Sequence, residues 1–146
     1  MKLDLHIDPS LTEVTVTVRA PTRTAEVDAL LNRLAAGDTP LLGFRDDGAT
    51  VPLEADAVLR FYSEGKDVRA QTEDSVFTVQ ERLYELEHLL AGQPFARVSR
   101  SEIVNLKRVT ALGLSLTGTI RMTLTGGTVC YVSRRYAKRI KEVLGI

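Results

Sequence analysis

From residue 41 onward, short segments that are either apolar or alternate between apolar and polar residues follow one another at close intervals, which restricts the fold more than any other feature. β-Branched and apolar residues dominate these segments. They span residues 41–45, 50–53, 58–62, 67–72, 75–79, 95–98, 109–116, 120–124 and 128–132. Runs of this length, joined by turns such as Asp46-Asp47-Gly48 and Gly126-Gly127, are typical of antiparallel hairpins. The sequence therefore predicts a β-rich α+β fold.

Three other segments have the periodicity of amphipathic helices. Residues 24–36 have Thr24 as the expected N-cap and place four apolar residues on one side, namely Val27, Leu30, Leu31 and Leu34. Residues 81–91 carry leucines on one side. Residues 134–144 follow Ser133 as a second expected N-cap and set basic residues against an apolar stripe. We expect a helix in each segment, the last one basic and C-terminal.

The first 20 residues are predicted to form a β-strand region. Residues 13–18 alternate strictly and are rich in valine and threonine, and Asp8-Pro9-Ser10 marks a turn before them. With the helix at 24–36, this region makes an N-terminal strand–helix unit. We assign that unit to residues 1–48 and the β-rich domain to residues 49–146.

Charge is distributed unevenly, although the net charge of the chain is zero. Residues 1–92 hold 9 Lys and Arg against 17 Asp and Glu, whereas residues 93–146 hold 10 Lys and Arg against 2 acidic residues. These counts give net charges of −8 and +8. Such asymmetry indicates either a surface that binds a polyanion or mutual attraction of the two halves within one fold.

Targeting and redox features point to the cytosol. No run of residues approaches the length of a membrane helix, and the N-terminus lacks the basic start and apolar run of a signal peptide. Cys130 is the one cysteine, so no internal disulfide can form. We therefore expect a cytosolic protein.

Catalytic and metal-binding motifs are not apparent in the sequence. His6 and His88 lie far apart, and neither has the neighbours of a catalytic constellation. No Cys, His and carboxylate residues have metal-ligand spacing, and no glycine-rich phosphate loop occurs. The sequence therefore predicts no enzyme activity, no cofactor and no metal.

The basic residues are better organised. Arg97, Ser99, Arg100 and Ser101 lie where a strand enters a turn, and such side chains suit phosphate oxygens and base edges. The same stretch, from Ser99 to Glu102, also has the pattern of a capping box that would start a short helix. Both interpretations stay open at this stage.

Two further basic pairs are candidates for phosphate contacts. Arg134 and Arg135 lie at a helix N-terminus, where the helix dipole disfavours cations, and a bound phosphate would relieve that conflict. Lys107-Arg108 precedes a strand and by itself is more typical of solvated surface.

Residues 95–106 carry the stretch Phe-Ala-Arg-Val-Ser-Arg-Ser-Glu-Ile-Val-Asn-Leu, which resembles the central motif of LytTR-type DNA-binding domains. The resemblance continues upstream at residues 62–64 and 83–90, and downstream at Gly126-Gly127 and residues 132–136. It therefore covers roughly residues 50–146 in colinear order. Ser99 departs from the family pattern, because histidine is usual at this position.

The resemblance implies an elongated antiparallel β fold that binds promoter DNA, often as a homodimer on direct repeats, by inserting loops into successive major grooves. Ser99-Arg100 would enter one groove, Arg135 with Arg134 the other, and the Gly126-Gly127 hairpin would lie near the minor groove between them. Because Ser99 replaces histidine, base reading there falls to Arg100. The expected contact residues are Arg97, Ser99, Arg100, Ser101, Asn105, Lys107, Arg134, Arg135 and Lys138.

The chain resembles the small stand-alone regulators of this family, which often act with a small membrane protein that restrains them. Residues 1–48 would then serve dimerisation or partner binding. A protein-interaction or ligand-sensing module without DNA binding is the main alternative. RNA binding is a weaker one, because the chain has no tryptophan and few aromatic residues to stack on bases.

Overall fold

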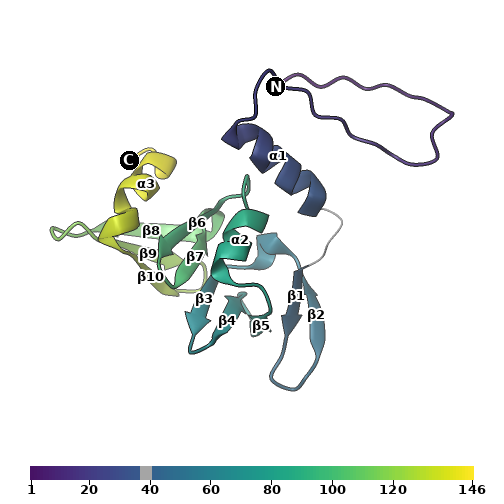
Figure 1. Ribbon diagram of the computed structural model, residues 1–146. Helices are drawn as coiled ribbons and strands as arrows, with labels where there is room; N and C mark the ends of the chain where they lie inside the picture. Colours follow the sequence, from purple (N-terminus) through teal and green to yellow (C-terminus); the bar gives the residue numbers. More distant parts are fainter. Residues whose placement is uncertain (37–40) are drawn as a thin grey trace.

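The computed structural model describes residues 1–36 and 41–146 (Figure 1). The strands are β1 (Leu41–Phe44), β2 (Thr50–Leu53), β3 (Arg60–Glu64), β4 (Asp67–Gln71), β5 (Val76–Val79), β6 (Phe95–Ser99), β7 (Glu102–Asn105), β8 (Val109–Leu114), β9 (Ile120–Leu124) and β10 (Val129–Val132). The helices are α1 (Ala25–Ala36), α2 (Leu83–Leu89) and α3 (Arg134–Leu144), with short 3₁₀ turns η1 (Ala55–Ala57) and η2 (Leu106–Arg108). The predicted β-rich α+β fold with a C-terminal helix is confirmed.

The larger sheet has seven strands in the order β2-β1-β5-β4-β3-β7-β6. Its neighbouring strands are antiparallel, and the register places Phe61 of β3 opposite Ile103 of β7. Both side chains are buried and belong to a core cluster that also takes in Leu86 of α2. Alternating apolar residues on adjacent strands therefore line one face of the sheet, and α2 covers it.

The smaller sheet has the order β10-β9-β8 and forms a second core with α3. Ile120 and Met122 of β9 are fully buried in this core, together with Ile140 of α3. Val98 of β6 and Val104 of β7 belong to the same cluster. The second core thus joins the small sheet to the edge of the large one and gives α3 its position.

Helix α1 begins as the sequence predicts and packs against the α2 region. The hydroxyl of Thr24 accepts a hydrogen bond from the Val27 amide at 3.3 Å, as an N-cap should. Asn32 donates a side-chain hydrogen bond to the carbonyl of His88 at 3.3 Å. Neither α1 nor any other helix in the described ranges combines the length and apolar character needed to cross a membrane.

The N-terminal arm, residues 1–20, differs from its prediction. The expected strand over residues 13–18 is absent, and residues 1–24 contain no helix or strand. A strand requires a neighbour to satisfy its backbone groups, and none of the residues described in the structure pairs with this segment. Figure 1 shows the arm as an open loop that extends away from the rest of the molecule.

The capping-box interpretation of residues 99–102 is also wrong. Ser99 ends β6 and Glu102 begins β7, so the stretch forms a tight hairpin and no helix starts there. All four residues of β7 are buried, because this strand pairs with both β3 and β6. Pairing with the distant strand β3, which no local pattern reveals, decides its conformation.

The large sheet extends beyond the predicted division of the chain. Strand β1, which begins at Leu41, pairs with β2 and β5 and is therefore part of the sheet. The assignment of residues 1–48 to a separate unit stays a prediction.

Candidate nucleic-acid interface

The β6–β7 hairpin presents Arg100 at its turn. Arg100 and Ser101 are exposed, and the Ser101 amide donates to the Ser99 hydroxyl at 3.2 Å. The carbonyl of Ser101 also accepts the Ser63 amide at 2.9 Å, which ties the turn to β3. Hydrogen bonds on both sides therefore hold the turn, and the Arg100 side chain projects from a fixed backbone.

Arg97 holds this turn through hydrogen bonds to its backbone. Its guanidinium donates to the carbonyls of Ser99 at 2.8 Å and Arg100 at 2.5 Å, and it pairs with Glu87 of α2 at 3.2 Å. The side chain keeps only 17% of its surface exposed. With these bonds Arg97 positions the turn, and little of its guanidinium is available to a ligand.

Two basic residues beside the turn were missed by sequence reasoning. Lys66, in the β3–β4 turn, and Arg82, before α2, line a shallow pocket of about 330 Å³ that Arg97 and Arg100 also line. Arg82 donates to the Lys66 carbonyl at 2.9 Å, which links the two segments. Both residues lie within residues 1–92. Because the net charge of that part is negative, the charge distribution gave no reason to select single basic residues there. The structure thus enlarges the basic surface around Arg100.

The N-terminus of α3 carries the second group of basic residues. Arg134 donates to the carbonyl of Thr117 in the β8–β9 turn at 2.8 Å, so the helix start is held against that turn. Arg135 and Lys138 are exposed, and the Arg135 guanidinium lies 5.6 Å from the centre of the Tyr136 ring. The Ser133 side chain makes no cap hydrogen bond, and its carbonyl accepts the amides of Tyr136 and Ala137.

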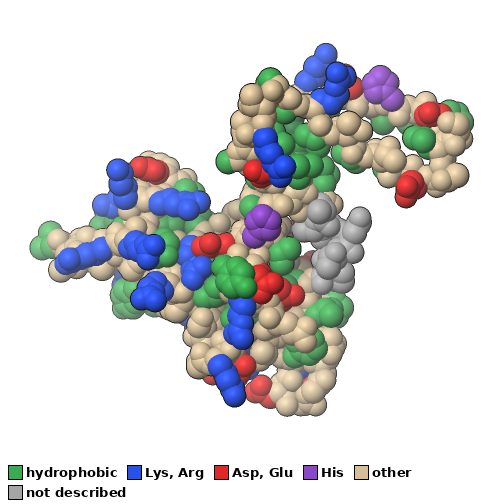
Figure 2. Space-filling model, viewed as in Figure 1, with side chains coloured by type: hydrophobic (Ala, Val, Ile, Leu, Met, Phe, Trp, Pro, Cys, Tyr) green, Lys and Arg blue, Asp and Glu red, His purple; other side chains and the backbone are tan. Residues whose placement is uncertain are grey.

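These two groups lie on adjoining elements. The Ser133 amide donates to the Val98 carbonyl at 2.9 Å, so the residue before Arg134 contacts the residue before Ser99. Helix α3 also packs against β6. Figure 2 shows Lys and Arg side chains gathered over α3 and the small sheet, while Asp and Glu lie mainly over α2 and the larger sheet.

Few of the basic residues in 93–146 are neutralised by the acidic part of the chain. Among the described residues, three ion pairs join the two parts: Arg97 with Glu87, Arg108 with Glu73, and Arg60 with Glu102. Only the first two take their basic residue from 93–146. Mutual attraction within the fold therefore accounts for a small share of the charge asymmetry, and the remaining cations stay available to an external anion.

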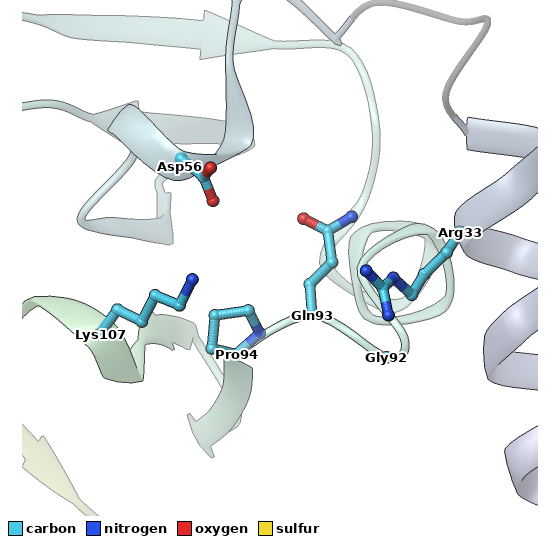
Figure 3. A pocket seen from close by; sticks show the side chains of 6 residues that line it. All are labelled: Arg33, Asp56, Gly92, Gln93, Pro94 and Lys107. Carbon is cyan, nitrogen blue, oxygen red and sulfur yellow. The ribbon is translucent and has the colours of Figure 1, made fainter. Parts of the chain in front are cut away.

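Two of the expected contact residues lie apart from this surface. Asn105 is 1% exposed, donates to the Val58 carbonyl at 3.0 Å and accepts the Lys107 amide at 3.1 Å. Lys107 lines a separate pocket of about 650 Å³ between α1 and η1. Figure 3 shows its ammonium group pointing toward Asp56, with Gln93 and Arg33 farther along the same pocket.

The Gly126-Gly127 turn also lies apart from Arg134. It joins β9 to β10, whereas Ser133 and α3 follow the other end of β10. The turn beside Arg134 is the β8–β9 turn, through Thr117. The expected position of the glycine hairpin near the minor groove between the two major grooves stays a prediction.

A buried polar network stabilises the junction between the two sheets. Glu102, at the start of β7, accepts from Arg60 at 2.6 Å and from the Cys130 thiol at 3.2 Å. Arg60 also donates to Gln71 at 2.7 Å, and Gln71 donates to the hydroxyl of Thr128 at 2.9 Å. Burial, together with the adjacent Glu102 carboxylate, raises the pKa of the Cys130 thiol to about 12. The network connects β3, β4 and β7 to β10, directly behind the β6–β7 turn.

Comparison with known proteins agrees with this geometry. Residues 48–145 match the LytTr DNA-binding domain family. Uncharacterized HTH-type transcriptional regulators of Staphylococcus aureus strains NCTC 8325 and MRSA252 are 38% and 37% identical over 148 residues. Each alignment covers 100% of this chain and 99% of the relative.

A solved structure shows the same fold. The LytTr DNA-binding domain of a Bacillus cereus protein described as a methyl-accepting/DNA response regulator superposes with a TM-score of 0.70 at 26% identity. That match covers 75% of this chain and 100% of the solved one. The family match, the full-length relatives and the shared fold lead to one conclusion. The chain belongs to the LytTR family of DNA-binding transcriptional regulators and is not an enzyme.

Proposed function

We propose that this protein regulates transcription by sequence-specific binding to promoter DNA, and that it reads the DNA with the β6–β7 turn and the N-terminus of α3. The hydrogen bond between Ser133 and Val98 supports the proposal most directly, because it couples two exposed basic elements at a fixed separation. Within the described ranges, the side chains of Arg100 and Arg135 make no hydrogen bond and no ion pair with the rest of the fold. Each is therefore free to enter a major groove.

Different side chains take different roles in this proposal. Arg100 and Arg135 offer exposed guanidinium groups, which bind guanine edges in bidentate fashion. Ser99 and Ser101 supply hydroxyl groups at the same turn. Lys138 lies one helical turn beyond Arg134 on an exposed position and suits a phosphate contact.

Strands separate each helix from the next in the described part of the chain. Recognition by a helix-turn-helix unit would need two consecutive helices, and this topology provides a turn and a helix end in their place. The geometry therefore favours insertion of loops into the groove over insertion of a recognition helix.

The first test is fluorescence anisotropy of the protein titrated onto DNA from its own upstream promoter, at two salt concentrations and against scrambled competitor. We expect binding that survives the competitor and weakens steeply with salt, since several phosphate contacts release counterions. Absence of binding at low salt would contradict the proposal. It would favour the alternative, in which the basic surface docks on an acidic protein partner.

We further propose that the protein acts as a homodimer and that the N-terminal arm and α1 supply a contact surface away from the basic one. A small membrane protein that restrains the regulator is the other candidate for that surface.

A further inference from the structure

The N-terminal arm exposes more large apolar side chains than any other part of the described chain. Six of them keep between 65% and 94% of their surface exposed: Met1, Leu3, Leu5, Ile7, Val14 and Val16. Soluble proteins seldom leave a contiguous set of this size open to water, and such a set marks a contact surface.

The turn of the arm determines which side chains share a face. The Leu11 amide donates to the Asp8 carbonyl at 3.2 Å, and the Asp8 carboxylate accepts from the Ser10 amide at 3.0 Å and the Ser10 hydroxyl at 2.6 Å. If the two segments paired in the register that this turn begins, Leu5 would lie opposite Val14 and Leu3 opposite Val16.

That register places apolar residues mainly on one face and polar residues mainly on the other; the exceptions are Thr12, opposite Ile7, and Leu11, opposite Asp8. Because directly opposed residues share a face, Ile7, Leu5, Leu3 and Met1 would lie on the same side as Val14 and Val16. The opposite face would carry polar residues, namely Lys2, Asp4, His6, Glu13, Thr15 and Thr17. The arm therefore encodes an amphipathic hairpin, and nothing within the described residues covers its apolar face.

We propose that a second copy of this chain covers that face, so that the arms of two protomers pack against each other and form the dimer. An isolated two-stranded hairpin is marginally stable in water. Packing of its apolar face against the arm of a second protomer would stabilise it. In the structure of one protomer, the turn of the arm is formed. The two segments beside the turn form no β-ladder among the described residues, so the arm is open. This proposal names the surface of the homodimer proposed above and does not depend on DNA binding.

Charge favours a second copy over an anionic partner. Residues 1–20 hold two basic residues, Lys2 and Arg19, and three acidic ones, Asp4, Asp8 and Glu13, for a net charge of −1. Two arms therefore repel each other little. A negatively charged lipid surface or a nucleic acid would gain no attraction from them.

The area is of the size that a dimer needs. Burial of the six apolar side chains would remove on the order of 500 Å² per protomer from water. Leu31 and Leu34 of α1, which are 40% and 44% exposed, extend the apolar surface. Together they approach the roughly 800 Å² per partner of a standard interface.

The location of the arm leaves the basic surface free. Figure 1 shows it extending from the start of α1, away from α3 and the small sheet. Pairing through the arms would therefore join two protomers while both basic surfaces stay open to DNA.

The test compares two neighbouring substitutions on opposite faces, Val16→Asp and Thr15→Asp, by sedimentation velocity over a wide range of protein concentration. We expect the wild type and Thr15→Asp to sediment as dimers, and Val16→Asp as a monomer. Because Val16 is 65% exposed, its replacement leaves both cores intact, which an unchanged thermal unfolding midpoint at monomer concentrations would verify.

A separate measurement, the affinity for a single promoter half-site, tests the DNA-binding proposal independently of the dimer proposal. Val16→Asp and Thr15→Asp should both retain the wild-type half-site affinity, because neither residue belongs to the basic surface. A wild type that stays monomeric, or a Val16→Asp variant as dimeric as Thr15→Asp, would overturn the proposal. Binding of a monomeric wild type to phosphatidylcholine vesicles, lost in Val16→Asp, would overturn it too and assign the face to a membrane partner.

Discussion

The backbone amide of Ser133 donates to the carbonyl of Val98 at 2.9 Å, and this contact connects the end of the small sheet to the edge of the large one. The next residue along each segment, Arg134 or Ser99, belongs to the proposed DNA surface. A shared core of fully buried residues such as Val98 and Ile140 backs the contact, so we expect the two elements to keep their relative position when DNA binds.

Loss of either exposed arginine should weaken specific binding. We expect Arg100→Ala and Arg135→Ala each to cost about 1–3 kcal/mol in binding free energy to promoter DNA and to relax the preference at one base position. Anisotropy titrations on promoter and point-mutated sites measure both effects. Arg45→Ala, which removes an exposed guanidinium from the β1–β2 turn, is the matched control. An affinity unchanged in a folded Arg100 variant would remove that residue from the interface.

Replacement of Lys138 should act on all sequences alike. A lysine that contacts phosphate contributes no base discrimination, so Lys138→Ala should lower affinity for promoter and scrambled DNA by similar factors. The slope of log affinity against log salt should fall by about 1. A change confined to the promoter sequence would instead make Lys138 a base-reading residue.

Arg97 should behave as a positioning residue. Its guanidinium holds the Ser99 and Arg100 carbonyls, so Arg97→Ala should loosen the turn and weaken promoter binding. Because the side chain is mostly enclosed, the salt dependence should match that of the wild type. The ratio of promoter to scrambled affinity is the quantity to follow. A salt slope reduced as in Lys138→Ala would show that Arg97 contacts phosphate directly.

The thiol of Cys130 should be inert in the folded protein at ordinary pH. Its pKa is raised from 9.0 to about 12, so the folded state holds this proton more firmly than the unfolded chain does. The resulting stabilisation is fully present below pH 9.0 and is lost as the pH rises toward about 12. Reaction with a thiol reagent at pH 8 should be slow, and denaturant should accelerate it strongly.

A second measurement separates the effect of Cys130 ionisation on stability from the effects of other groups that titrate at high pH. The urea midpoint of the wild type should fall more between pH 9 and pH 11 than that of Cys130→Ala. Equal losses in the two proteins would show that Cys130 ionises as freely in the fold as in the unfolded chain.

Local patterns predicted many of the elements. The bounds expected for residues 120–124 and 134–144 coincide with β9 and α3, because strict alternation and a clear helix start are properties of short segments. The same signals gave two errors. The capping-box pattern at Ser99–Glu102 was overridden by pairing of β7 with β3, and Glu102 was recruited by Arg60. The alternation at residues 13–18 forms no ladder with any described residue, including the facing segment of the arm.

The candidate site was predicted in outline. Arg100, Arg134 and Arg135 lie on exposed ends of elements, as their positions in the sequence indicate. Asn105 follows the same motif, yet its side chain is buried and hydrogen-bonded to Val58, a neighbour that only the fold supplies. Lys66 and Arg82 were not predicted, because acidic residues surround them in the sequence. Motif position therefore identifies the basic turns, and burial decides which side chains reach solvent.

The proposed placement of recognition on turns has a consequence for how target preference can change. Arg100 projects from a two-residue turn whose backbone is held from behind, while Val98 and Val104 of the adjacent strands are fully enclosed. Under the proposed mode of binding, replacement of this outward side chain should alter which base is favoured without disturbing packing. Target preference and thermodynamic stability would then depend on separate residues, so that substitutions at the turn change the preferred operator while the scaffold stays the same.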